Sequence, residues 1–149
     1  MNTIDDLSSI FEDEFIVPGA PQGKARPRFT RQGHAYTPKK THDYESYIKM
    51  CYRQKVKEKC YKEDEPLEIS INAYYPIPKS YSKAKKQQAM AGALVPRSKP
   101  DIDNIAKAVL DALNLTAYED DKLVAKLTVE KHYSEEPRLE IRIGALHER

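Results

Sequence analysis

The chain has 149 residues, of which 40% are hydrophobic and 32% are charged. This composition favours one globular domain over a disordered chain or two independent cores. The sequence has no run of about 18 apolar residues that would span a membrane, and its first residues lack the basic and apolar regions of a signal peptide. We therefore expect a cytoplasmic protein that has no membrane partner.

The cysteines and histidines predict neither a disulfide nor a zinc site. Cys51 and Cys60 are expected in one helix, nine residues apart, where they would point to opposite sides and could not be bridged. The four histidines are scattered and are not paired with cysteine at zinc spacings. We predict two reduced, structural thiols.

The net charge of +2 hides an uneven distribution along the chain. Residues 1–14 carry acids but no lysine or arginine, and we expect them to be an acidic leader, with one amphipathic helical turn through Ile4, Leu7 and Phe11, ahead of a domain over residues 15–149. Residues 22–62 are strongly basic, and residues 76–100 contain lysine and arginine but no acid. Such tracts are typical of phosphate binding, although a solvated lysine-rich surface explains them equally well on charge alone.

The first half of the chain predicts a strand, a hairpin and a helix. Residues 14–17 form a strand that ends at Pro18, and two extended arms around a turn at Gln32 and Gly33 form a basic hairpin over residues 24–37. A helix follows over residues 43–60, with Thr41 as its N-cap. Its apolar stripe consists of Tyr44, Tyr47, Ile48 and Cys51.

The second half predicts three strands and two helices. Residues 67–75 alternate, with Leu67, Ile69, Ile71, Ala73 and Tyr75 on one face. A short basic helix capped by Ser80 or Ser82 runs to Met90, and the clearest helix begins at Asp101, with Ile105, Ala106, Val109, Leu110 and Leu113 as its apolar stripe. Strands over residues 123–133 and 138–143 follow, with Leu123, Ala125, Leu127, Val129, Leu139, Ile141 and Ile143 facing inward. This order predicts an α+β (α/β) fold, a mixed sheet packed with helices.

The start of the clearest helix carries the densest group of candidate functional residues. Pro100 favours an extended residue before it, and Asp101 is a strong N-cap type, so the helix should begin there. Because a cap residue is not helical, Asp101 and Asp103 can turn their carboxylates toward one ion. Lys107 and Asp111 then follow Asp103 at four-residue steps.

A second acidic group, Glu119-Asp120-Asp121, comes after this helix. Mg²⁺ prefers oxygen ligands, and three aspartates beside a basic surface are suited to metal-assisted phosphodiester hydrolysis. If the helix runs antiparallel to the strand that follows Asp121, the sheet would have to bring Asp121 to the helix start. Each aspartate alone is better explained structurally: Asp101 as a cap, Asp103 and Asp111 as partners of Lys107, and the pair at 120–121 as a loop.

The acidic stretch resembles the RusA-type Holliday junction resolvases. The matching residues are Lys99-Pro100-Asp101-Ile102-Asp103-Asn104-Ile105, Lys107-Ala108, Asp111-Ala112-Leu113 and Glu119-Asp120-Asp121, with Gly19, Pro21, Lys24, Arg26-Pro27-Arg28 and Tyr36-Thr37-Pro38 at the front. The resemblance covers roughly residues 14 to 143, and the family's usual glycine after the helix is replaced by Asn114.

This resemblance implies a homodimeric endonuclease of DNA recombination and repair, often encoded by a phage or prophage, that uses Mg²⁺ to nick four-way junctions symmetrically. Asp101, Asp103 and Asp121 would be the catalytic metal ligands and Lys107 the supporting lysine, with Asp121 preferred over Asp120. Mn²⁺ is expected to substitute for Mg²⁺, and no nucleotide cofactor is expected. Residues expected to contact DNA are Lys24, Arg26, Arg28, Lys99 and Lys131, the last being similar to a recurrent family lysine.

Two other functions fit the same residues. A nuclease for flaps, forks or single strands would need the same carboxylates but a different path for the DNA. A basic DNA-binding module without catalytic activity would use the aspartates only as caps and solvated groups.

Overall fold

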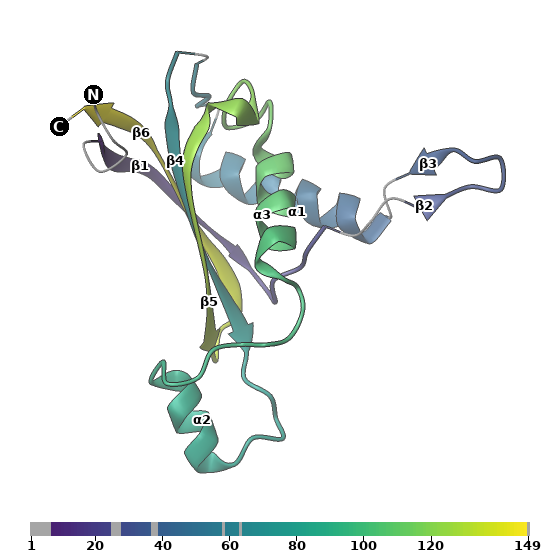
Figure 1. Ribbon diagram of the computed structural model, residues 1–149, viewed down its shortest axis with the longest axis vertical. Coiled ribbons are helices and arrows are strands. Elements are labelled where there is room, and N and C mark those ends of the chain that lie inside the picture. Colours follow the sequence, from purple (N-terminus) through teal and green to yellow (C-terminus); the bar gives the residue numbers. More distant parts are fainter. Residues whose placement is uncertain (1–6, 25–27, 37–38, 58, 63, 149) are drawn as a thin grey trace.

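The computed structural model describes residues 7–24, 28–36, 39–57, 59–62 and 64–148. Its main sheet has four strands in the order β1-β6-β4-β5, and a separate two-stranded sheet pairs β2 with β3 (Figure 1). The elements along the chain are β1 (Leu7–Pro18), β2 (Arg28–Phe29), β3 (Ala35–Tyr36), α1 (Lys39–Val56), β4 (Leu67–Pro76), α2 (Lys83–Met90), α3 (Ile102–Leu113), η2 (Asp121–Leu123), β5 (Val124–Ser134) and β6 (Arg138–Glu148). The predicted mixed α+β fold in a single domain is confirmed.

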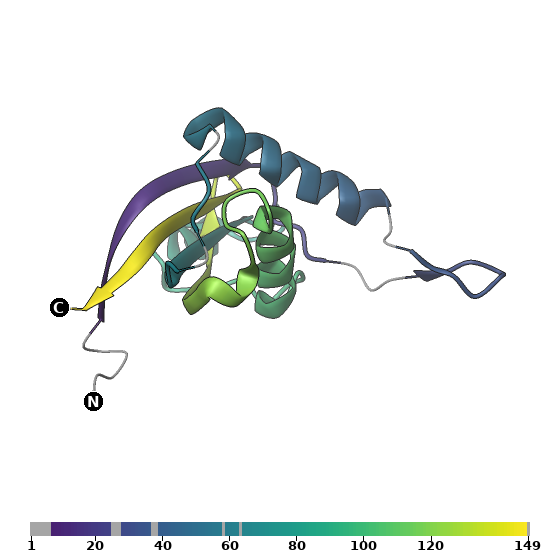
Figure 2. The ribbon, with the colours of Figure 1, turned by 90° about the horizontal axis from the view of Figure 1, so that it is seen from above.

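Helices α1 and α3 lie on the same side of the four-stranded sheet, as the two views in Figures 1 and 2 show. The strand side chains that face these helices form the core, because apolar residues alternate along β1, β4 and β6. They are Phe15, Val17, Leu67, Ile69, Ile71, Ala73, Tyr75, Leu139, Ile141 and Ile143, all at most 3% exposed. The opposite face carries charged residues such as Glu14, Arg142 and Glu140.

The β4-α3-β5 segment positions the acidic residues. β4 pairs antiparallel with β6 but parallel with β5, so α3 is the crossover between two parallel strands. The apolar stripe of α3 is buried on the sheet through Ile105, Val109 and Leu113, as its spacing predicts. α3 therefore runs antiparallel to β4 and β5, and its first turn lies at the carboxyl ends of those strands (Figure 1).

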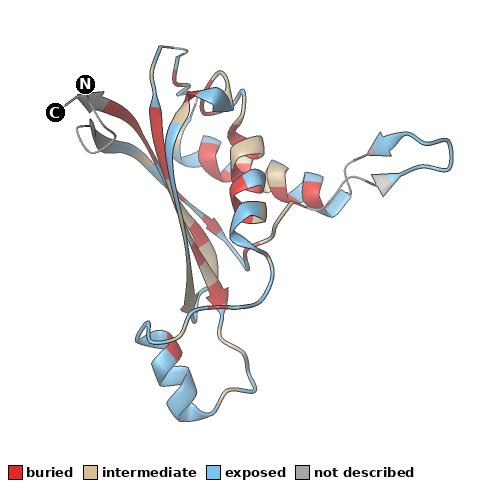
Figure 3. Cartoon of the chain, viewed as in Figure 1, coloured by how far each residue is buried: buried red, intermediate tan, exposed pale blue. Residues whose placement is uncertain are grey.

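Two basic segments project from this body. Antiparallel pairing of β2 with β3 confirms the predicted hairpin, and Gly33 in its turn has a φ of 82° that suits glycine. α2 is capped by Ser82, one of the two caps predicted, and buries only Ala89. Figure 3 shows most of α2 and the part of the hairpin over residues 29–35 as exposed, in contrast to the buried faces of α1 and α3.

The N-terminal segment differs from the prediction. Residues 7–14 are not part of a helical turn, because Leu7 to Pro18 form one strand that pairs with β6 from Glu148 to Arg138. This pairing provides backbone hydrogen-bond partners that a lone amphipathic turn would lack. Ile4 lies outside the described residues.

The predicted boundaries of α1 are also wrong. The helix spans Lys39–Val56, so Thr41 lies inside it and is buried rather than acting as a cap. Lys57 has a φ of 65°, which ends the helix before Cys60. Cys51 and Cys60 are therefore not in one helix, although both are free cysteines as predicted.

The inward face predicted for β5 is only partly correct. Leu123 is buried, but Ala125 is exposed, Leu127 is 39% exposed and Val129 is half-buried. Among the strands that the structure describes, β5 is an edge strand that pairs only with β4, and the helices leave its outer part uncovered. In the part of the chain that the structure describes, no helix has the length and apolar character needed to cross a bilayer.

Candidate functional site

The acidic pair lies at the first turn of α3, as predicted. Asp101 is the N-cap residue with an extended backbone (φ −73°, ψ 158°), and Asp103 follows in the first turn. The Asp101 side chain accepts no capping hydrogen bond. Both carboxylates are exposed, as is Lys107 one turn further along. The pair is therefore available to an external cation, and the helix N-terminus beside it adds a partial positive charge.

Side chains from the sheet contact the segment that leads into this pair. The Tyr75 hydroxyl, at the end of β4, donates a hydrogen bond to the carbonyl oxygen of Pro100. The Lys131 ammonium, on β5, donates to the carbonyl oxygen of Ser98 at 2.8 Å and lies 4.8 Å from the centroid of the Tyr75 ring. The acidic pair thus lies at the carboxyl ends of two parallel strands, where open α/β sheets commonly bind ligands.

The segment before the basic hairpin also packs on α3. A Cβ on Gly23 would lie 2.8 Å from the Cβ of Pro100 and 2.9 Å from that of Asn104, so only glycine fits there without a shift. The Lys24 amide donates to the carbonyl oxygen of Asn104 at 3.1 Å, and the Lys24 ammonium pairs with Asp111 and, at 3.7 Å, with Glu45. The hydrogen bond to Asp111 raises the pKa of Lys24.

The second acidic group lies near Asp111, two turns along α3 from Asp103. Asp120 caps η2, because its carboxylate accepts from the Lys122 amide at 2.9 Å, and this bond lowers the pKa of Asp120. Partial desolvation, the hydrogen bond with Asp120 and the charges of Asp120 and Asp111 raise the pKa of Asp121. Of the two aspartates, Asp120 therefore has a capping role in this chain, whereas Asp121 lies among like charges.

One chain does not bring all the predicted carboxylates together. Val124, at the start of β5, pairs with Leu67, and Lys131, near its end, pairs with Ala73. These two positions on β5 are roughly 23 Å apart at the usual rise of a parallel strand. Asp121 lies just before the start of β5, whereas Asp101 lies near Lys131. Among the described residues, no group of three or more histidine, cysteine, aspartate or glutamate side chains could hold a metal ion.

The residues expected to contact DNA differ in how accessible their side chains are. Lys99 is exposed beside the acidic pair, whereas Lys24 and Lys131 have the partners in this chain given above. Arg28 lies in the projecting hairpin, and Arg26 lies outside the described residues. The exposed lysines of α2 add positive charge at the same end of the sheet as the acidic pair.

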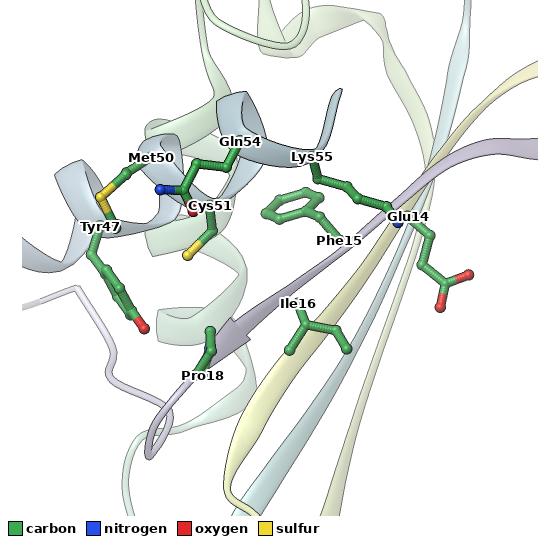
Figure 4. Close-up of a pocket in the computed structure, with 9 residues that line it drawn as sticks. All are labelled: Glu14, Phe15, Ile16, Pro18, Tyr47, Met50, Cys51, Gln54 and Lys55. Atoms are coloured by element: carbon green, nitrogen blue, oxygen red, sulfur yellow. The ribbon is translucent and has the colours of Figure 1, made fainter. Parts of the chain in front are cut away.

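A cavity of about 530 Å³ lies elsewhere, between β1 and α1. Figure 4 shows Phe15 and Cys51 facing each other across it, with Tyr47 and Ile16 nearby. The acidic pair on α3 is not part of its lining. The Asp101 and Asp103 side chains are instead exposed at the carboxyl ends of β4 and β5, where a large ligand can reach them.

The fold and the site define a small α+β protein with exposed carboxylates between basic segments. The family model described as Endodeoxyribonuclease RusA matches residues 18–144 of the chain. The chain therefore belongs to the endodeoxyribonuclease RusA family, as the stretch from Lys99 to Leu113 predicts. The chain is also similar to the uncharacterized protein YqaN of Bacillus subtilis (strain 168), with 41% identity over 135 residues that cover 87% of this chain and 94% of that protein.

Three partners of the site were not predicted from the sequence. Tyr75 has the pattern of a core position, and its hydroxyl contact with Pro100 depends on where the chain returns after α2. Asp111 was expected to pair with Lys107, but its partner is Lys24, which is 87 residues away. Ser98, whose backbone carbonyl binds Lys131, carried no signal in the sequence.

Proposed function

We propose that the protein is a Mg²⁺-dependent, structure-specific endodeoxyribonuclease that resolves Holliday junctions by paired symmetric nicks in DNA recombination and repair. One observation carries this proposal: Asp101, an exposed N-cap residue whose side chain makes no capping hydrogen bond, lies beside Asp103 at the start of α3 in a chain of the RusA family. The setting that we propose is the cytoplasm, with a phage or prophage origin, no membrane partner and no nucleotide cofactor.

The donor set suits Mg²⁺, which binds through one or two carboxylates together with water and substrate phosphate oxygens. Asp101, Asp103 and Asp121 would hold the ion, and Mn²⁺ would substitute. When bound, the metal would activate water and stabilise charge on the phosphate. Lys107, exposed one turn above Asp103, would neutralise the phosphate in the transition state or orient the nucleophile.

Positive side chains around this pair would hold the DNA backbone. Arg26 and Arg28 of the hairpin segment, Lys99 and the α2 lysines would contact phosphates. Lys24 was assigned to the same role, and its ion pair with Asp111 gives it a second one, which is to hold the base of the hairpin on α3. Phosphate contacts of this kind position the DNA but do not read its sequence.

A homodimer formed through the edge of β5 would complete the site. The exposed edge of β5 can pair antiparallel with that of a second copy, which would set the Asp121 end of one chain beside the Asp101 end of the other. A register centred on Thr128 would oppose Lys126 with the partner's Glu130, and Leu127 with the partner's Val129. The pattern is self-complementary in charge and in apolar contact.

Cleavage of defined DNA substrates tests the proposed function. The protein is incubated with a labelled four-way junction, a linear duplex and a flap, with and without Mg²⁺, and we expect symmetric nicks only in the junction and only with metal. The variant Asp103→Asn should lose cutting while it still binds the junction and remains folded by circular dichroism. Binding without cleavage of any substrate would instead favour the DNA-binding module, and equal cutting of linear and branched DNA would contradict the resolvase.

A further inference from the structure

The segment that connects α2 to α3 is held by the sheet immediately before it delivers Asp101. Figure 1 shows this segment crossing the carboxyl ends of β4 and β5 on its way to α3. Two side chains bind its backbone there: the Lys131 ammonium binds the carbonyl oxygen of Ser98 at 2.8 Å, and the Tyr75 hydroxyl binds that of Pro100. The two bonded carbonyls are three residues and one residue before Asp101.

These two side chains also contact each other and are anchored by different strands. The Lys131 ammonium lies 4.8 Å from the centroid of the Tyr75 ring, a distance typical of a cation–π contact. The Tyr75 residue is only 3% exposed, so the core fixes the position of its hydroxyl. Burial, and after it the charge of Asp101, raises the pKa of Tyr75 to about 12, so the hydroxyl remains a donor at neutral pH.

We propose that Tyr75 and Lys131 are positioning residues that fix the Ser98–Pro100 backbone and thereby hold Asp101 and Asp103 in place for a divalent cation. The proposal rests on the proposed function, because the cation is the Mg²⁺ of that site. It gives Lys131 a different role from the phosphate contact expected from the family resemblance, since its ammonium is engaged by a backbone carbonyl of its own chain.

The physical reason is that metal affinity depends on how firmly the ligands are oriented. Asp101 makes no capping hydrogen bond of its own, so its side chain does not fix its geometry. The backbone before it is fixed by the two carbonyl contacts, one from each parallel strand. Loss of a hydrogen bond that orients a metal ligand directly typically lowers metal affinity about 10-fold to 100-fold. These contacts act one step further away, on the backbone before the ligand, so we expect an effect at the lower end of that range.

The experiment compares variants of the full-length protein. Tyr75→Phe removes only the hydroxyl, Lys131→Met removes the donor at similar size, and Lys131→Arg retains a charged donor. Tyr74→Phe, on the opposite face of β4, is the matched control, and Lys99→Met is the contrast for a lysine that contacts phosphate. Three properties are measured: Mn²⁺ affinity without DNA by electron paramagnetic resonance, junction affinity in EDTA at several salt concentrations, and hydrogen exchange of residues 98–105.

We expect Tyr75→Phe and Lys131→Met to weaken Mn²⁺ binding about 10-fold and to speed hydrogen exchange in residues 98–105, with junction affinity and its salt dependence unchanged. Lys131→Arg should restore most of the metal affinity, and Tyr74→Phe should match the unmodified protein. Lys99→Met should leave Mn²⁺ affinity unchanged and reduce the slope of log affinity against log salt by about one.

Unchanged Mn²⁺ affinity in both variants would overturn the proposal, as would a Lys131→Met variant that behaves like Lys99→Met. If the unmodified protein binds no Mn²⁺, the positioning role fails together with the metal part of the proposed function. If it binds Mn²⁺ but cuts no junction, the proposed function fails, while the comparison of variants still decides the positioning role.

Discussion

At the scale of single residues, Asp121 lies in an unfavourable electrostatic environment. Partial desolvation, a hydrogen bond from the protonated carboxyl to Asp120 and the nearby charge of Asp111 all raise its pKa. A carboxyl whose pKa is raised in the folded protein favours folding when it is protonated and opposes folding as the pH rises through that pKa. Charges held together against their mutual repulsion are common at functional sites.

Asp121→Asn should therefore raise the melting temperature at pH 7, because the ionised carboxylate is removed from its acidic neighbours. The gain should disappear at about pH 3, where the aspartate is mostly protonated in both states. Thermal unfolding monitored by circular dichroism at several pH values measures the difference. Asp64→Asn, at an exposed aspartate elsewhere, is the control and should change little at either pH. A destabilised Asp121→Asn at neutral pH would contradict this explanation.

At the scale of elements, the two α-helices with identified N-caps, α2 and α3, differ in how their cap residues act. Ser82 accepts a hydrogen bond from the Lys85 amide at 3.2 Å and so caps α2 in the usual way. Asp101 occupies the same position on α3 without such a bond. A side chain at a cap position that does not cap is available for another role.

This difference predicts that alanine substitution of Ser82 and of Asp101 lowers helix stability by different amounts. Ser82→Ala should destabilise α2 by about 1 kcal/mol, whereas Asp101→Ala should cost α3 less than about 0.5 kcal/mol because no capping bond is lost. Native-state hydrogen exchange of the amides in each helix gives the local free energies of opening. A cost near 1 kcal/mol for Asp101→Ala would mean that its main role is that of a cap.

The periodic elements could be predicted from the sequence because their apolar repeats specify one buried face. The buried faces predicted for residues 67–75 and for α3 are confirmed. The buried face predicted for β5 is partly wrong, because the alternating pattern around Leu127 is the same whether a strand lies at the centre or at the edge of a sheet. The prediction that Thr41 is an N-cap is wrong, because threonine is common at N-caps but also occurs inside helices, as it does here.

The candidate site likewise has features that the local sequence predicts and features that depend on tertiary packing. That Asp101 and Asp103 lie together at a helix start is a local property, set by Pro100 and the cap position, and the structure has them there. The place of Asp121 depends on the direction of α3 relative to β5, which local pattern does not contain. The contacts of Tyr75 and Lys24 depend on tertiary packing between distant segments.

At the scale of the whole molecule, the separation of Asp121 from Asp101 within one chain makes mixed dimers informative. If each site takes Asp103 from one chain and Asp121 from the other, Asp103→Asn and Asp121→Asn should each be inactive alone. A mixed dimer of the two would contain one site with both substitutions and one intact site. Mixing the two inactive proteins, with subunit exchange, should therefore restore nicking of one strand per junction. Persistent inactivity of verified mixed dimers would show that both residues act within one chain.

The proposed β5 interface can be tested by a substitution on β5 and a matched control substitution on β1, the opposite edge of the sheet. Leu127→Asp places a charge on the exposed part of β5, whereas Ile16→Asp does so on β1 at a side chain that is 47% exposed, against 39% for Leu127. Sedimentation should show a monomer for Leu127→Asp and a dimer for Ile16→Asp. A dimer for both variants would place the interface elsewhere.

The pairing of β1 with β6 sets Leu7 directly opposite Glu148. The two ends of the described chain are therefore neighbours in space, so a short glycine-serine linker could join them without strain. A circular permutant that is closed there and reopened between Gln32 and Gly33, in the exposed hairpin turn, should keep the sheet and α3 intact, since no strand or helix is cut. A circular-dichroism spectrum and a melting temperature close to those of the original chain would bear this out. The permutant would then carry its new termini at the tip of the basic hairpin, where a fluorophore could report how that arm moves when DNA is added.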